Sequence, residues 1–272
     1  MRTRPNYVAG FVASIWLLII GVPLFVLLAT SIQPRSKYTD NGPLSIPSTL
    51  TFDNFVEVVN SGFLRYVWNT VLVSTGTVAV VLLFAVPISY AVVRGRGWMT
   101  TSVFRLFLLG LAIPSQAVII PLFYLVNRLG LYDTLWGIIL PTAAFALPVS
   151  VLVLSSGMRD ISVSLYEAMA LDGARPGRVL VSLVIPLSRS SLATTCVFAA
   201  LQAWNGLLFP LIMTQSSDTR VVTLGLYNFV SEYGANVPAL LAAVLMSAVP
   251  ILVVYLFARR ALVMGLTGAG DK

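Results

Sequence analysis

The sequence contains no histidine and a single cysteine, Cys196, and only 10% of its 272 residues are charged. Without histidine the chain lacks the commonest metal ligand and the commonest general base, so neither a metal centre nor membrane-embedded catalysis is expected. One cysteine excludes an intrachain disulfide. Soluble domains average about 25% charged residues, so the composition also excludes a soluble monomer.

Long apolar runs take the place of charge: 58% of the residues are hydrophobic, and the mean hydropathy is +0.91. A helix needs about 20 apolar residues to cross a membrane. The first candidate run follows Arg2 and Arg4, as in a signal peptide, but it is longer than the roughly 7–15 residues of a cleavable signal, so we expect it to be retained. The sequence therefore predicts an all-α, polytopic membrane protein with one transmembrane domain over residues 1–272. Its six spans are residues 8–30, 67–93, 106–126, 135–154, 192–213 and 237–258.

The charged residues between these spans are unevenly distributed. An even number of spans places both termini on one side of the membrane, and the connections on that side carry a net charge of +8, against −1 on the other. An excess of Lys and Arg in short loops marks the cytoplasmic face, so both termini are predicted to be cytoplasmic and the total of +7 reflects topology, not nucleic-acid binding. The side predicted to be cytoplasmic carries Arg2, Arg4, Arg94, Arg96, Arg105, Arg159, Arg175, Arg178, Arg189, Arg259, Arg260 and Lys272, with Asp160, Glu167, Asp172 and Asp271. The other side carries Arg35, Lys37, Arg65, Arg128 and Arg220, with Asp40, Asp53, Glu57, Asp133, Asp218 and Glu232.

Two connections carry helix signals of their own. In the cytoplasmic connection 155–191, Ser164 and Glu167 have the spacing of a capping box, which predicts a short helix that begins at Ser164. Gly173 predicts the end of that helix. On this local evidence, a surface helix whose Glu only caps is an equal alternative to a docking helix. On the opposite side, the loop after the first span is predicted to contain a short helix near residues 53–60.

The connection 155–191 also resembles the EAA loop of ABC importer permeases. The run EAMALDGARPGRVLVSLVIPLSRS, residues 167–190, follows the family pattern of EAA, then Asp-Gly-Ala, then a hydrophobic turn that ends in Ile-x-Leu-Pro. Position 169 is Met where the family has Ala, and the closing residues are shifted, which leaves the details of the docking surface open. The matching positions are Glu167, Ala168, Asp172, Gly173, Ala174 and Pro186.

This resemblance implies that the loop is a coupling helix that inserts into a separate ATPase subunit. The chain contains no G-x-x-x-x-G-K-[ST] phosphate loop, so it is not expected to be an enzyme or to bind a cofactor, and ATP and Mg would be held by the partner. Glu167 would pair with a basic residue of the ATPase, and small side chains would allow close contact. The implied coupling residues are Tyr166, Glu167, Ala168, Met169, Ala170, Asp172, Gly173 and Ala174.

Further stretches are similar to carbohydrate permeases of the maltose-transporter type. They are Asn69-Thr70, residues 120–140, residues 203–213 and the tail 258–272. The resemblance implies the type I importer permease fold in a bacterial inner membrane and a sugar or oligosaccharide as substrate. It also implies a second homologous permease, two ATPase subunits and an extracytoplasmic binding protein or lipoprotein as partners.

Polar residues inside the predicted spans are the candidates for contact with a sugar. Gln202, Trp204 and Asn205 lie in the fifth span, and Gln116 lies in the third. Amides and an aromatic face suit a neutral sugar. Polar side chains in membrane bundles also often bond only to a neighbouring helix, so a packing role is the alternative for each of them.

Other classes of membrane protein remain possible from sequence. An ion-coupled secondary transporter usually needs ionisable groups inside the membrane, and all six predicted spans lack them. A sodium site built from carbonyl and hydroxyl oxygens would escape this test. An ABC permease for a non-sugar solute such as glycerol phosphate is a further alternative, whereas a channel or a scaffold is less favoured.

Overall fold

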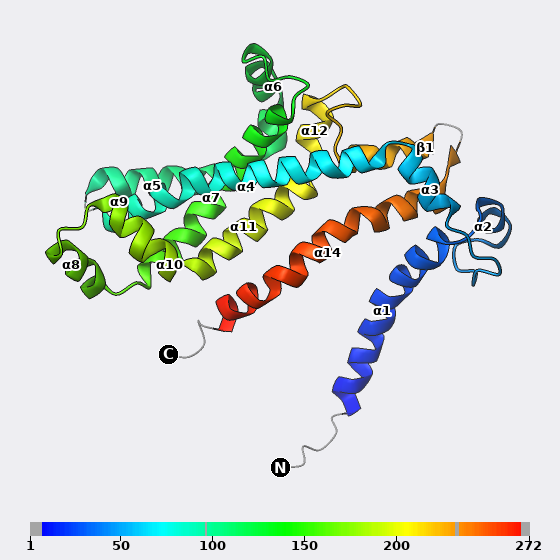
Figure 1. The fold of residues 1–272 in the computed structure, drawn as a ribbon, viewed down its shortest axis with the longest axis horizontal. Coiled ribbons are helices and arrows are strands. Elements are labelled where there is room, and N and C mark those ends of the chain that lie inside the picture. Colours follow the sequence, from blue (N-terminus) through cyan, green and yellow to red (C-terminus); the bar gives the residue numbers. More distant parts are fainter. Residues whose placement is uncertain (1–6, 96, 232–233, 268–272) are drawn as a thin grey trace. The chain divides into compact units, whose positions relative to one another are not determined.

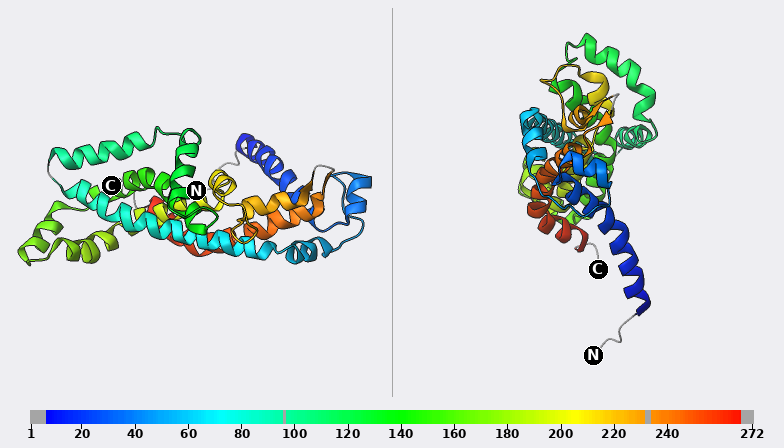
Figure 2. Two further views of the ribbon diagram at one scale, coloured as in Figure 1. Left: turned by 90° about the horizontal axis from the view of Figure 1, so that it is seen from above. Right: turned by 90° about the vertical axis from the view of Figure 1, so that its right-hand side faces the viewer.

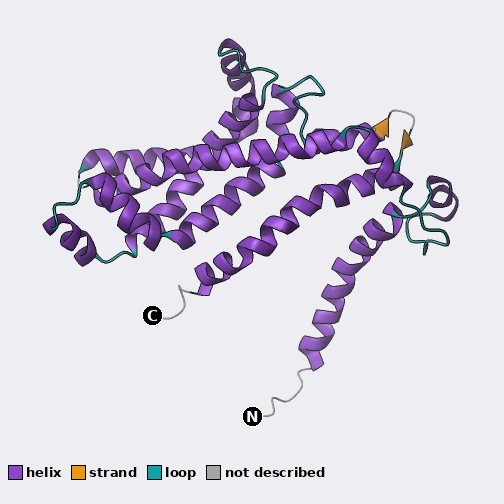
Figure 3. Ribbon diagram, viewed as in Figure 1, coloured by secondary structure: helices purple, strands orange, loops and turns teal. Residues whose placement is uncertain are grey.

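The computed structural model describes residues 7–95, 97–231 and 234–267 and divides the chain into two compact units. The first unit comprises residues 1–64 and 225–251, and the second comprises residues 65–224 and 252–272. The described chain is mostly helical, as predicted, with two short strands (Figure 3). Of the charges used to predict topology, Arg2, Arg4, Arg96, Glu232, Asp271 and Lys272 lie outside the described residues.

The first unit is organised around the segment that follows the first helix. Asn54 is buried there, and its side-chain amide donates hydrogen bonds to the carbonyls of Ser31 and Gln33, both at 2.9 Å. The predicted helix over residues 53–60 is confirmed. The elements of this unit are α1 (Tyr7–Ser31), α2 (Arg35–Asn41), α3 (Asp53–Asn60), η3 (Leu226–Phe229), the antiparallel pair β1 (Val230–Ser231) and β2 (Gly234–Ala235), and the first part of α14 (Val237–Thr267).

The second unit is a helical bundle with α7 at its centre (Figure 1). Its core brings together apolar residues from α4, α7, α8, α9 and α11. Glycines permit the closest approaches: Gly157 of α7 lies directly against Ser191, and a Cβ at Gly110 would lie 3.2 Å from Pro148. The elements are α4 (Phe63–Arg94), α5 (Trp98–Gly110), η1 (Ser115–Val118), α6 (Ile119–Arg128), α7 (Leu135–Arg159), α8 (Val163–Leu171), α9 (Pro176–Val179), the π-helical turn η2 (Leu180–Val184), α10 (Ile185–Leu187), α11 (Arg189–Trp204), α12 (Leu208–Met213) and α13 (Val222–Gly225).

The helices test the predicted spans only in part. Among the described residues, α1, α4 and α7 are long and apolar enough to cross a membrane, and the number rises to five if each of two bent helix pairs is one span. Six spans with cytoplasmic termini therefore stay a prediction. The organisation as one transmembrane domain over residues 1–272 also stays a prediction.

Two predicted spans are not continuous helices. The third, residues 106–126, is broken between α5 and η1, where the chain bends by 94°. Pro114 explains this break, because proline has no N–H for a helical bond and disfavours the helical conformation of the residue before it.

The fifth, residues 192–213, is broken between α11 and α12. Pro210 is the local cause, because it cannot donate the helical hydrogen bond to the carbonyl of Gly206. That carbonyl instead accepts a hydrogen bond from the Thr223 hydroxyl at 2.8 Å.

Candidate functional site

Helix α8 is the first candidate site. It lies at one end of the second unit, next to α9 and away from α6 and α12, in Figure 1 and in the left view of Figure 2. The predicted capping box is wrong: α8 begins at Val163 after Ser162, and no side chain caps its first turn. The Ser164 hydroxyl bonds the Ser162 hydroxyl at 2.8 Å instead. Glu167 is exposed and makes no hydrogen bond or ion pair with any described residue, so capping does not occupy its carboxylate.

The end of α8 is a Schellman motif, as Gly173 predicts. Gly173 adopts a φ of +69°, which glycine reaches without the steric cost that a Cβ imposes. Its N–H donates to the carbonyl of Ala170, and the N–H of Ala174 donates to that of Met169, both at 3.0 Å. Pro176 then opens α9 at its first position, where the missing N–H costs nothing. The turn between the two helices is therefore held by the backbone itself.

The two faces of α8 differ sharply. Tyr166 is 5% exposed and belongs to the core, and the half-buried Met169 and Ala174 pack against that core. These three side chains hold α8 and the turn after it on the bundle. The remaining implied coupling residues are all exposed: Glu167, Ala168, Ala170, Asp172 and Gly173.

Leu171, which was not among the residues predicted from the sequence, lies at the tip of α8 with its side chain 90% exposed. Val163 and Leu165 add further exposed apolar surface to this short helix. The signal available in the sequence was the presence of these three large apolar residues within nine positions of a connection between spans. Such surface, beside an unpaired carboxylate, suits contact with another protein.

Tyr166 connects α8 to the end of α4. The guanidinium of Arg94, the last residue of α4, lies 4.1 Å from the centre of the Tyr166 ring. Burial raises the pKa of the Tyr166 hydroxyl, and the nearby Arg94 charge opposes that rise. The ring is thus held by packing on one side and by a cation–π contact on the other.

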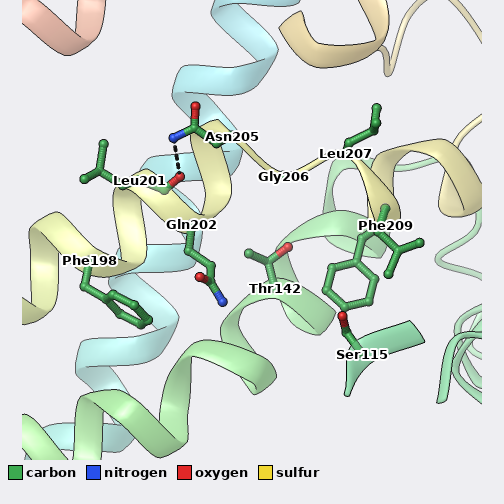
Figure 4. Close-up of a pocket in the computed structure, with 10 residues that line it drawn as sticks. Ser115, Thr142, Phe198, Leu201, Gln202, Asn205, Gly206, Leu207 and Phe209 are labelled. Atoms are coloured by element: carbon green, nitrogen blue, oxygen red, sulfur yellow. Dashed lines mark hydrogen bonds between the residues drawn. The ribbon is translucent and has the colours of Figure 1, made fainter. Parts of the chain in front are cut away.

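A cavity of about 440 Å³ is the second candidate site, and it lies at the break between α11 and α12. This volume is within the range of small-molecule sites, about 300–1,000 Å³. The lining contains amide, hydroxyl, aromatic and aliphatic groups and no ionisable side chain. It consists of Ser115, Thr142, Phe198, Leu201, Gln202, Asn205, Gly206, Leu207, Leu208 and Phe209 (Figure 4).

Only two of the four candidate sugar-contact residues line this cavity. Gln202 extends from α11 into it and makes no hydrogen bond within the described chain, so its amide is available to a ligand (Figure 4). The Asn205 amide nitrogen donates to the Leu201 carbonyl at 3.0 Å. Trp204 and Gln116 are not part of the lining. Gln116 accepts a hydrogen bond at 3.3 Å from the hydroxyl of Ser115, which is a lining residue.

Two further lining residues, Thr142 and Phe209, were not among the candidates predicted from the sequence. Thr142, from α7, donates its hydroxyl hydrogen to the Ile138 carbonyl at 2.7 Å and keeps its oxygen as an acceptor. Phe209, from α12, lies 5.5 Å from the ring of Phe145. An aromatic ring, an amide and a hydroxyl around one uncharged cavity are groups that can bind a neutral polar solute.

The chain is similar to known membrane transport proteins. The family described as "Binding-protein-dependent transport system inner membrane component" matches residues 82–261. The arabinooligosaccharides transport system permease protein AraQ of Halalkalibacterium halodurans is 32% identical, over 94% of this chain and 96% of that protein. The trehalose transport system permease protein SugB of Mycobacterium tuberculosis is 30% identical, over 94% of both chains. A crystal structure of a bacterial ABC transporter involved in import of the acidic polysaccharide alginate contains a chain with the same fold, at a TM-score of 0.82 and 22% identity over 96% of this chain and 98% of that one.

Proposed function

Because the chain belongs to the family of binding-protein-dependent transport system inner membrane components, we propose that it is one permease subunit of an ATP-driven importer for a neutral sugar or oligosaccharide. In this role it forms half of the translocation pathway and couples to a separate ATPase through α8. The observation that carries the proposal is the pairing of a protruding, backbone-fixed helix with an uncharged polar cavity in one unit of a family member.

The exposed face of α8 supports coupling to a partner protein. Glu167 is free of intramolecular bonds, and Ala168 and Ala170 allow a partner backbone to approach closely. Leu171 supplies an exposed apolar contact at the tip. The buried face, held by Tyr166 and Met169, joins this surface to the core that contains α4, α7 and α11. Movement of a docked ATPase would therefore be transmitted to several helices at once.

The cavity supports a neutral substrate. Its lining holds no Asp, Glu, Lys or Arg, which suits neither a phosphorylated solute nor an acidic sugar and provides no proton relay. This favours a neutral sugar over the alternatives of glycerol phosphate and ion-coupled transport. The names of AraQ and SugB point to the same substrate class.

The proposed complex contains further subunits. A second, homologous permease completes the pathway, and two ATPase subunits hold ATP and Mg. An extracytoplasmic binding protein or lipoprotein delivers the substrate, and the words "binding-protein-dependent" in the family description support this last partner. This chain requires no cofactor of its own. The complex resides in the bacterial inner membrane. Within it, this chain has six spans and cytoplasmic termini.

Deletion of the gene tests the substrate class directly. Cells that lack the gene are expected to lose uptake of at least one radiolabelled neutral sugar from a panel of arabino-oligosaccharides, trehalose and N-acetylated disaccharides, and the intact gene should restore it. Glycerol 3-phosphate in the same panel serves as the charged control. Loss of glycerol 3-phosphate uptake alone, or of no solute, contradicts the proposal.

Replacement of Gln202 by Ala tests the cavity. Because a binding protein delivers the substrate, that protein sets the half-saturating concentration, and the cavity acts after delivery. Loss of one or two hydrogen bonds at about 1 kcal/mol each is expected to lower the maximal uptake rate by roughly fivefold or more, with half-saturation unchanged. Gln116→Ala is the matched control, because Gln116 is an exposed amide outside the lining. Equal effects of the two substitutions would remove Gln202 from the pathway.

A further inference from the structure

Asp133 lies in the connection between α6 and α7 and binds the chain that follows α12. One carboxylate oxygen accepts four hydrogen bonds: from the backbone N–H groups of Gln215 and Ser216 at 2.9 and 3.0 Å, and from the hydroxyls of Ser216 and Thr219 at 3.1 and 2.6 Å. These bonds, led by the Gln215 N–H, lower the pKa of Asp133 to about 2. The carboxylate is therefore ionised at every physiological pH.

The backbone of Asp133 also binds the end of α12. Its N–H donates to the carbonyl of Met213, the last residue of α12, at 2.8 Å. Asp133 is the one described non-glycine residue with a positive φ, at +56°. Such a conformation costs free energy and persists where the surrounding contacts impose it, often at functional sites. Asp133 thus grips α12 at its C-terminal end through both backbone and side chain.

Helix α4 holds the far end of this segment. The amide of Asn69 donates to the carbonyls of Asp218 and Arg220, both at 2.8 Å. The buried Thr70 hydroxyl accepts from the N–H of Val222 at 2.9 Å. These bonds join residues that are 149 to 152 positions apart in the sequence. Residues 214–222 are consequently fixed at both ends by side chains of other elements.

The fixed segment leads directly to the cavity. Thr223 follows it and donates to the Gly206 carbonyl at 2.8 Å, the carbonyl that Pro210 leaves without a helical partner. Gly206 lines the cavity, as do Leu208 and Phe209 of α12. The position of this wall therefore depends on the Asp133 bonds at the end of α12 and on the Thr223 bond at its start.

We infer that Asp133 and Thr223, with Asn69 and Thr70, are positioning residues that hold α12 and the break before it, and so set one wall of the substrate cavity. The four side chains are called the clasp below. That the cavity binds a substrate rests on the proposed function, but the geometry of the wall can be measured without any sugar. During transport the clasp keeps α12 and residues 214–222 moving as one body with α4 and the start of α7.

A thiol reporter on α12 tests the clasp in the complete reconstituted importer. Cys196, the only cysteine, is replaced by Ala, and Leu208→Cys then places one thiol in the cavity wall. The rate of alkylation by a water-soluble maleimide is measured without substrate. Asp133→Ala and Thr223→Val are each expected to change this rate by about fivefold or more, because each releases α12 from hydrogen bonds worth about 1 kcal/mol apiece. Asp133→Asn, which keeps an acceptor oxygen, should change it less than Asp133→Ala does.

Asp218→Ala is the matched control. Asp218 is a neighbouring carboxylate in the same segment, but its side chain makes only an exposed ion pair with Arg65 at 2.7 Å, and such pairs contribute little. A second reporter, Leu201→Cys on α11, should react at the same rate in all variants. The inference is overturned if Thr223→Val leaves the Leu208→Cys rate unchanged, or if Asp218→Ala changes it as much as Asp133→Ala.

Transport separates this inference from the proposed function. If the clasp positions the cavity wall, Asp133→Asn lowers the maximal uptake rate of the sugar found in the deletion panel and leaves half-saturation unchanged. An altered thiol rate with no sugar uptake by the wild-type complex would contradict the proposed substrate class and keep the clasp. An unaltered thiol rate in the variants, with normal sugar uptake by the wild-type complex, would contradict the clasp and keep the proposed substrate class.

Discussion

Proteoliposomes that carry the complete importer are expected to take up sugar only when ATP is enclosed with the ATPase subunits, and uptake should fall to background without it. This chain contains no phosphate loop, and the cavity it forms has no ionisable lining residue that could carry a proton. We therefore expect the energy for transport to come from a partner. Accumulation of the radiolabelled sugar, measured with enclosed ATP, with enclosed ADP and with neither, provides the comparison.

An ionophore that collapses the proton gradient is the control for this experiment. Uptake that depends on ATP should continue at an unchanged initial rate in its presence. A second control contains this chain alone, with no ATPase, and should show no uptake under an imposed proton or sodium gradient. Gradient-driven uptake by the chain alone would identify an ion-coupled transporter and refute the proposed energy source.

Replacement of Glu167 by Ala is expected to reduce both sugar uptake and substrate-stimulated ATP hydrolysis by roughly tenfold or more. The carboxylate is exposed and unpaired in this chain, so its removal costs the permease no internal contact. Docking would instead leave a basic group of the ATPase buried without its partner, which typically costs about 2–5 kcal/mol. Co-purification of the ATPase with the permease measures docking, and uptake per ATP hydrolysed measures coupling.

Asp160→Ala is the matched control for Glu167→Ala. Asp160 is an exposed carboxylate in the turn just before α8 and lies outside the EAA run. Its replacement should leave co-purification and uptake within about twofold of wild type, as surface substitutions usually do. Glu167→Gln, which retains hydrogen-bonding oxygen but no charge, should give an intermediate loss. Equal behaviour of Glu167→Ala and Asp160→Ala would show that Glu167 has no special part in coupling.

Local sequence signals predicted the short helices well where one residue type suits one conformation. Gly173 identified the end of α8 because its positive φ favours glycine. The short helix predicted near residues 53–60 was likewise confirmed, as α3. The N-cap of α8 was misplaced by two residues, because Ser164 has the capping-box spacing to Glu167, whereas Ser162 is the residue that precedes the first helical turn. Burial of Tyr166 could not be read locally, since it depends on packing in the core and on Arg94, which comes from a distant helix.

The two broken spans show a second limit of sequence reasoning. Residues 106–126 and 192–213 are predominantly apolar and contain no charged residue, and hydropathy alone treats each as one helix. Prolines inside membrane helices are common and often only bend them, so Pro114 and Pro210 did not by themselves predict a break. At Pro210 the break is accommodated because Thr223, which lies 17 residues after Gly206, donates the missing hydrogen bond to the Gly206 carbonyl.

The sequence by itself determined that the chain is helical and apolar, where its short helices end, and, through the EAA run, which family it resembles. These properties depend on composition and on neighbours within a few residues. Only the tertiary structure decided which face of α8 is exposed, that Gln202 and Asn205 share a cavity while Trp204 and Gln116 do not line it, and that Asp133 grips the end of α12. Each of these depends on groups that are far apart in the sequence, such as Asp133 and Thr219, which are 86 residues apart, and no local pattern in the chain records such a pairing.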